Sequence, residues 1–157
     1  DFKNTGIILT SNVGSDLIMN MCGDPDLIPD ADVLATSMRD PLLKVFPAAF
    51  LGRMTVVPYF PLASDVMARI VALKLRRIQR RIQENHGTAF GWDESAIQAI
   101  IGRATDIESG GRMVDAILST HVLARISKEI LERTMNAQTL ANVRVTATDK
   151  ELVLSFD

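Results

Sequence analysis

Apolar residues recur at three- and four-residue intervals between residues 64 and 84, and this pattern limits the fold more than any other in the sequence. The recurring positions are Met67, Val71, Leu75, Ile78 and Ile82. This spacing places them along one side of an α-helix, and such a helix buries its apolar side against other elements. We therefore predict a helix over residues 64–84 that contributes to a core.

The remainder of the C-terminal part predicts two further helices and a hairpin. We expect Asp93 to cap a helix that ends near Ala104, and a second helix to end near Thr134, because each segment has its own apolar stripe. Residues 142–147 and 151–156 alternate apolar and polar side chains around a polar turn. This alternation is typical of a β-hairpin with one buried face.

The N-terminal part predicts strands as well as helices. Residues 5–10 form an apolar run typical of a strand buried on both faces. Residues 54–59 combine apolar residues with a proline, which favours a strand at the edge or end of a sheet. Helices are expected at residues 15–21 and 31–46, the second with a break before Pro41.

Pro61 marks a junction between two predicted subdomains. Strands and helices alternate before it, so we predict an α/β unit over residues 1–61. Helices dominate after it, so we predict a small, mainly helical unit over residues 62–157 that ends in the hairpin.

Composition excludes several classes of function. The 157 residues include 17 basic and 19 acidic ones, a net charge of −2, so overall basicity does not indicate nucleic-acid binding. Cys22, His86 and His121 are too few for a disulfide framework, a CxxC pair or a Cys/His metal cluster, and we predict no metal site. No apolar run approaches the ~18 residues of a membrane span. Because the chain starts without Met or a leader, we expect a piece of a longer protein.

The polar side of the predicted helix over residues 64–84 is strongly basic. It carries Arg69, Lys74, Arg76, Arg77, Arg80 and Arg81. One interpretation is a site for nucleic acid, and the other is a solvated or subunit-facing surface. We favour the second interpretation because no aromatic residues interleave with the arginines to stack on bases.

Three residues stand in positions that suggest chemistry. Asn12 follows the first predicted strand, where ligands are met in open α/β sheets, although spacing alone favours the interpretation that Asn12 only closes a turn. Arg53 lies at the edge of a loop, and Arg112 lies at the start of a long helix, where a positive charge opposes the helix dipole. The sequence contains no GxxxxGK[ST], GxGxxG, GxSxG or HExxH motif.

The stretches around these three residues resemble Clp-type AAA+ unfoldases, in family order and over essentially the whole chain. Residues 1–14, which include Ile7-Ile8-Leu9-Thr10-Ser11-Asn12, resemble the sensor-one strand. Residues 46–53, Phe-Pro-Ala-Ala-Phe-Leu-Gly-Arg, resemble the arginine-finger box, and Gly110-Gly111-Arg112 resembles the sensor-two motif.

This resemblance implies the role of each residue and the fold. Asn12 would be sensor one, Arg53 an arginine finger that acts in trans on a neighbour's nucleotide, and Arg112 the sensor two that contacts the ATP phosphate. Residues 1–61 would be the truncated end of an AAA+ large α/β subdomain, and residues 62–157 the small AAA+ lid subdomain. The full-length protein would be a homo-hexameric ATPase that uses Mg-ATP. The isolated fragment, which lacks a phosphate loop and Walker B carboxylates, would bind no nucleotide and be inactive.

Departures from the wider family narrow the resemblance. Residues 19–24, Met-Asn-Met-Cys-Gly-Asp, replace the tripeptide with which peptidase-coupled unfoldases dock. Gly52 and Thr55 stand where disaggregases usually have Asn and an acidic residue. The chain is most similar to the ClpV family of type VI secretion systems, which implies contracted sheath proteins as substrate and the bacterial cytoplasm as location. The alternatives are a general Clp disaggregase, a non-enzymatic module that binds nucleic acid, and a helical scaffold without a nucleotide role.

Overall fold

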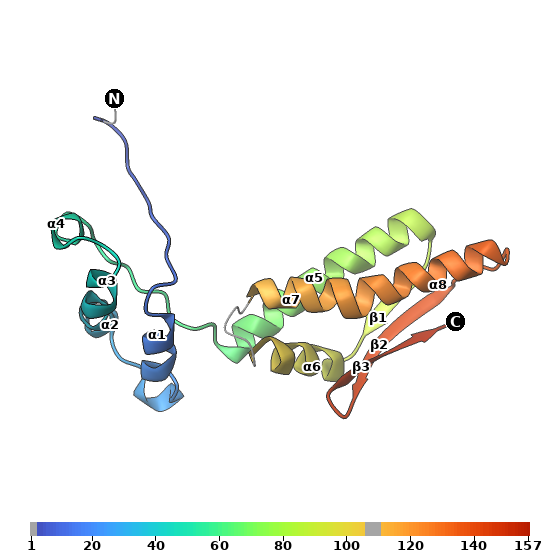
Figure 1. The fold of residues 1–157 in the computed structure, drawn as a ribbon. Coiled ribbons are helices and arrows are strands. Elements are labelled where there is room, and N and C mark those ends of the chain that lie inside the picture. Colours follow the sequence, from blue (N-terminus) through green and yellow to red (C-terminus); the bar gives the residue numbers. More distant parts are fainter. Residues whose placement is uncertain (1–2, 106–110) are drawn as a thin grey trace. The chain divides into compact units, whose positions relative to one another are not determined.

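The computed structural model describes residues 3–105 and 111–157 (Figure 1). The chain divides into two compact units, of which the first ends at Pro61 and the second begins at Leu62.

The second unit is a bundle of helices against a three-stranded sheet (Figure 1). Its elements are α5 (Ser64–His86), β1 (Ala89–Trp92), α6 (Glu94–Thr105), α7 (Gly111–Ile117), the π-helical turn η2 (Leu118–Leu123), α8 (Ala124–Met135), β2 (Asn142–Thr148) and β3 (Glu151–Phe156). The strand order is β1-β2-β3, with β1 parallel to β2 and β2 antiparallel to β3. This architecture confirms the mixed fold and the hairpin predicted from the sequence.

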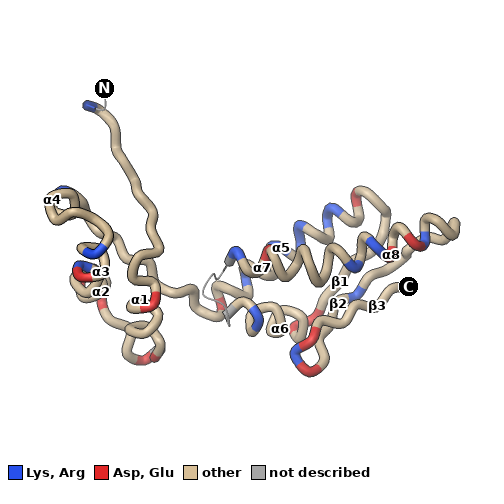
Figure 2. Tube along the Cα trace, in the orientation of Figure 1, with Lys and Arg blue, Asp and Glu red and all other residues tan. Residues whose placement is uncertain are grey.

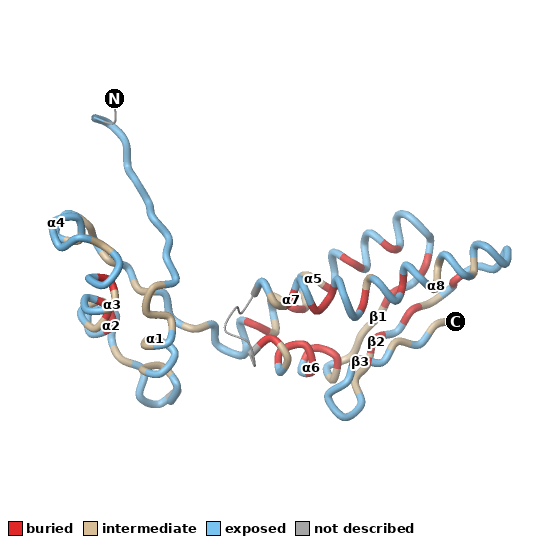
Figure 3. Tube along the Cα trace, viewed as in Figure 1, coloured by how far each residue is buried: buried red, intermediate tan, exposed pale blue. Residues whose placement is uncertain are grey.

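The core of the second unit lies between the helices and one face of the sheet (Figure 3). All five positions of the predicted α5 stripe are buried, and Val71 and Leu75 are fully so. The sheet contributes Val143, Val145 and Leu152 from the predicted alternation, whereas its other apolar residues, Ala147, Leu154 and Phe156, are partly buried against the core. The hairpin turns at Asp149 and Lys150, both with positive φ, as a two-residue type I′ connection requires.

The first unit is small and helical. Its elements are α1 (Ser15–Met21), the 3-10 turn η1 (Pro25–Leu27), α2 (Ala31–Ser37), α3 (Arg39–Leu43) and α4 (Ala48–Leu51). Leu34, Met38 and Leu42 are its buried apolar residues among those described. The predicted break in the helical region occurs at Met38, between α2 and α3, so Pro41 lies inside α3.

The predicted strands at residues 5–10 and 54–59 are wrong, because the structure assigns no strand to either segment. Ile7, Ile8 and Leu9 are 55–91% exposed, and Val57 is 68% exposed. An apolar run becomes a strand only when neighbouring strands satisfy its backbone groups. Among the residues that the structure describes, the first unit contains no strand with which these segments could pair.

Two general features bear on function. None of the described helices is both long and apolar enough to span a membrane. Within residues 3–105 and 111–157, no cluster of three or more His, Cys, Asp or Glu side chains is arranged to hold a metal ion.

Candidate functional site

Asn12 lies in a tight turn that leads into α1. Its carbonyl oxygen accepts hydrogen bonds from the Ser15 backbone N–H at 3.2 Å and from the Ser15 hydroxyl at 2.8 Å. The Ser11 hydroxyl accepts from the Val13 N–H at 3.1 Å. These bonds fix the backbone of the turn, while the Asn12 side chain is exposed and has no hydrogen-bond partner among the described residues. The amide can therefore donate to, or accept from, a ligand or a water.

Gly14 makes this turn possible. Its φ of 77° lies in the left-handed region, which side chains rarely adopt. A Cβ at this position would lie 2.5 Å from the Cε of Met38, so the turn also packs closely against the break between α2 and α3. Gly14 is the N-cap residue of α1, and no side chain caps the helix.

Arg53 follows the short helix α4. Pro47 is the N-cap residue of this helix, and the rings of Phe46 and Phe50 pack with their centroids 5.9 Å apart. The Arg53 N–H donates to the carbonyl of Phe50 at 3.1 Å, which continues the turn beyond Leu51. The Arg53 side chain is exposed, and no ion pair engages it within the part of the chain that the structure describes. Its guanidinium is therefore available to an external anion.

The structure brings the segments beside Asn12 and Arg53 against one cavity of about 220 Å³. Leu9, Ser11 and Val13 line one part of it, and residues 54–59 line another. Neither Asn12 nor Arg53 lines the cavity itself. The two residues therefore belong to the same unit, and each is next in sequence to residues that line this cavity.

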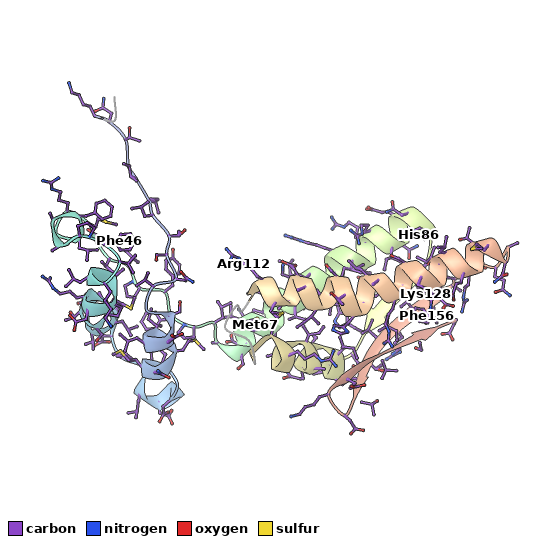
Figure 4. The ribbon with its side chains drawn as sticks, viewed as in Figure 1. Phe46, Met67, His86, Arg112, Lys128 and Phe156 are labelled. Carbon is purple, nitrogen blue, oxygen red and sulfur yellow. The ribbon has the colours of Figure 1, made fainter. Side chains whose placement is uncertain are left out.

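Arg112 is the second residue of α7 in the second unit. Its side chain is exposed and extends from the first turn of the helix (Figure 4). Arg112 has no ion pair with any described residue. Its positive charge near the positive end of the helix dipole is therefore not compensated by a carboxylate among those residues. Gly110, the first residue of the predicted sensor-two motif, lies outside the described residues.

An ion pair holds the first turns of α7 against α5. Lys74 on α5 donates to Oδ1 of Asp115, which lies three residues after Arg112. Sequence reasoning did not identify this pair, because the two residues are 41 positions apart and neither stands out in its own helix. The contact gives the backbone beneath Arg112 a defined position within its unit.

Asp93 has a structural role at the start of α6. Its Oδ1 accepts from the Ser95 hydroxyl at 2.6 Å and from the Ala96 N–H at 3.1 Å. These bonds to the ionised carboxylate lower the pKa of Asp93, with the Ser95 hydroxyl as the larger cause. The helix cap predicted from the sequence is confirmed.

Comparison with known proteins identifies the family of the second unit. Residues 62–145 match the family model described as the C-terminal, D2-small domain of ClpB protein. The chain is 44% identical to the AAA+ ATPase ClpV1 of Pseudomonas aeruginosa over 156 residues, which cover 99% of this chain and 17% of ClpV1. It is 43% identical to the chaperone protein ClpB of Yersinia enterocolitica over 131 residues, which cover 83% of this chain and 15% of that protein.

A solved structure shows the same fold. A closed-state cryo-electron microscopy reconstruction of Hsp104 with ATPγS and FITC-casein matches 94% of this chain and 24% of its own, with a TM-score of 0.68 and 19% sequence identity. The family model spans more than half of the chain, and the similarity to ClpV1 extends over nearly all of it. The chain therefore belongs to the Clp family that carries the ClpB-type C-terminal D2-small domain.

Proposed function

We propose that this chain supplies three residues of the nucleotide site, namely sensor one, the arginine finger and sensor two, to the second ATPase ring of a Clp-type AAA+ unfoldase. Arg53 carries the proposal: it is an exposed guanidinium without an ion-pair partner among the described residues, held at the end of α4. Residues 1–61 would be the end of the large α/β subdomain, and residues 62–157 the lid. The curated relatives are about six times longer than this chain, so the activity belongs to a longer protein.

Each side chain suits its role in phosphoryl transfer. This reaction needs the attacking water to be positioned and the charge on the γ-phosphate to be neutralised. The amide of Asn12 would orient the water. Arg53 would reach the nucleotide of a neighbouring subunit, so hydrolysis would depend on ring assembly. Arg112 would bind a phosphate of its own subunit's nucleotide and couple nucleotide state to the position of the lid.

The residues present fit ATP, because an exposed amide and two exposed guanidiniums match the charge and oxygens of a triphosphate. Mg²⁺, when bound with ATP, would neutralise charge on the phosphates. Its ligands and the phosphate loop would come from other parts of the longer protein. The isolated chain is therefore expected to be inactive, and measurable ATP turnover by the pure 157-residue chain would contradict this.

The finer function is the disassembly of contracted type VI secretion sheaths by a homo-hexamer in the bacterial cytoplasm. Support comes from the similarity to ClpV1 over 99% of the chain and from Gly52 and Thr55, which depart from the disaggregase pattern. A general disaggregase is the second candidate, because the family model and the Yersinia relative are both named for ClpB. If the full-length protein disassembles contracted sheaths and does not reactivate heat-aggregated protein, the result favours sheath disassembly. If it reactivates aggregated protein and leaves sheaths intact, the result favours a general disaggregase.

The Arg53→Ala variant of the full-length protein tests the ATPase role. An arginine finger contributes ~10³–10⁵ in rate, so turnover should fall by at least about a thousandfold while nucleotide binding is unchanged. Arg39→Ala is the matched control, since Arg39 is an exposed arginine of the same unit, on α3. If Arg53→Ala hydrolysed ATP as fast as the control, Arg53 would not be the arginine finger.

A further inference from the structure

Charged residues of both signs lie along α5, α7 and α8 (Figure 2). Ion pairs within one of these helices join residues four positions apart, as Lys128 and Glu132 do on α8. Lys74 and Asp115 differ, because their ion pair connects α5 to α7 across 41 positions of the sequence. This pair lies close to Arg112, the candidate sensor two, which is three residues before Asp115 on α7.

Asp115 is the acidic residue of α7, and its position allows it to compete for Arg112. Residues three apart on an α-helix are neighbours on its surface, so the Asp115 carboxylate can reach the Arg112 guanidinium. The structure does not use this contact, because Asp115 pairs with Lys74 and Arg112 has no ion pair with any described residue. The Arg112 side chain instead extends outward from the start of α7 (Figure 4).

Apolar packing holds α7 in place even without the ion pair. Val114 is fully buried, and Met113 packs against the same core. Asp115 is 64% exposed, and an ion pair with an exposed partner adds little to stability. The Lys74 side chain is only 22% exposed, so its amino group is held at a defined place beside α7. The pair is therefore better suited to control the charge next to Arg112 than to anchor the helix.

We propose that Lys74 is a positioning residue for Arg112: it binds and neutralises Asp115, which leaves the guanidinium free for a phosphate of the nucleotide. Without Lys74, Asp115 would keep its full negative charge three residues from Arg112. The carboxylate would then attract the guanidinium and repel the phosphate, and both effects weaken the binding of a nucleotide. This inference rests on the proposed role of Arg112 as sensor two.

The kinetics of ATP hydrolysis by the full-length protein test this role. Lys74→Met keeps the apolar stem of the side chain but removes its charge. It should raise the KM for ATP at least about threefold and change kcat by less than about twofold, because a lost binding interaction acts on KM. Lys74→Arg keeps a cation and should behave as wild type. Lys128→Met removes the cation from an ion pair on α8 and should leave KM unchanged.

Removing the carboxylate separates neutralisation from anchoring. Asp115→Asn also breaks the ion pair, but it leaves no charge to compete with the phosphate, so its KM should not rise above that of wild type. The double variant Lys74→Met with Asp115→Asn should have the KM of Asp115→Asn. In an Arg112→Ala background, Lys74→Met should raise KM by a smaller factor, because the phosphate is no longer held beside Asp115. A merely structural role of Lys74 would give the same factor in both backgrounds.

Three results would overturn the role of Lys74. They are a wild-type KM in Lys74→Met, a KM in Asp115→Asn as high as in Lys74→Met, and an equal effect of Lys74→Met with and without Arg112. If Arg112→Ala impairs hydrolysis while Lys74→Met does not, the proposed function stands and only the role of Lys74 is lost. If Arg112→Ala hydrolyses ATP as wild type does, Arg112 is not sensor two, and both proposals fail at this residue.

Discussion

Lys74 and Asp115 join α5 to α7 one turn away from Arg112. The Lys74 side chain is largely covered, at 22% exposed, whereas Asp115 is 64% exposed. We predict that Asp115→Asn destabilises the chain by at most about 1 kcal/mol, because solvent screens a pair with one exposed partner. Urea denaturation measures this, and Glu132→Gln, which removes the more exposed Lys128 pair on α8, is the control. A loss above about 3 kcal/mol would show that the pair is effectively buried.

Thr88 is the buried polar residue among those described, at 1% exposed, and its hydroxyl donates to the carbonyl of Leu140 at 2.8 Å. Thr88→Val keeps the shape of the side chain but leaves that carbonyl without its partner. It should cost about 1–3 kcal/mol in free energy of unfolding. Thr134→Val is the matched control, since Thr134 donates to the Ile130 carbonyl on an exposed turn where water can replace it. Equal losses for both variants would contradict the role of burial.

Leu75 and Leu73 lie on opposite sides of α5. Leu75 is fully buried, so Leu75→Ala should cost about 2–5 kcal/mol, from lost apolar burial and the cavity that remains. Leu73 is half exposed, so Leu73→Ala should change the free energy of unfolding by no more than about 0.5 kcal/mol. Chemical denaturation of both variants measures the difference. A large loss for Leu73→Ala would mean that this residue also supports the fold.

Asp93 should make the stability depend on pH. Its folded pKa is lowered by the Ser95 hydroxyl and the Ala96 N–H, so the ionised form is favoured by folding. The stabilisation is complete above the ordinary aspartate pKa of about 3.9 and disappears as the pH falls through the lower folded value. We predict that Asp93→Asn lowers the urea midpoint at pH 6 and that the difference from wild type shrinks below about pH 4. A difference that is constant between pH 3 and pH 6 would contradict this.

The second unit was largely predictable because its signals are local. In the stripe from Met67 to Ile82, the spacing of the apolar residues by itself predicts which side of the helix is buried. The alternation around Asp149 and Lys150 likewise predicts the buried face of the hairpin. The π-helical turn η2 was not predictable, since Leu118 and Val122 keep the four-residue spacing of an ordinary helix and are both buried.

The first unit was predicted less well, because a strand depends on partners elsewhere in a protein. Ile7 and Ile8 have the composition of a buried strand, yet composition does not supply the neighbours that would pair with them. Lys74 and Asp115 were missed for a similar reason, since only the fold brings the two side chains together. Asn12, Arg53 and Arg112 were singled out by their positions in the predicted elements, whereas their roles came from the resemblance and stay predictions.

The most direct test of the central claim is complementation between subunits of the full-length protein. Asn12→Ala removes the amide from a subunit's own nucleotide site, and Arg53→Ala removes the finger that the subunit offers to its neighbour. Alone, Asn12→Ala should lower ATP turnover by at least about a hundredfold, and Arg53→Ala by at least about a thousandfold.

In rings mixed from equal amounts of the two variants, some interfaces combine an intact Asn12 with an intact Arg53 from the neighbouring subunit. The measurement is the ATP turnover of these mixed rings, formed by letting native rings of the two variants exchange subunits without denaturant. The account predicts recovery to about a quarter of wild-type turnover, since random mixing pairs the two intact residues at that share of interfaces. Mixed rings that remain as inactive as either variant alone would contradict the account, because Arg53 would then not act on a neighbour's nucleotide.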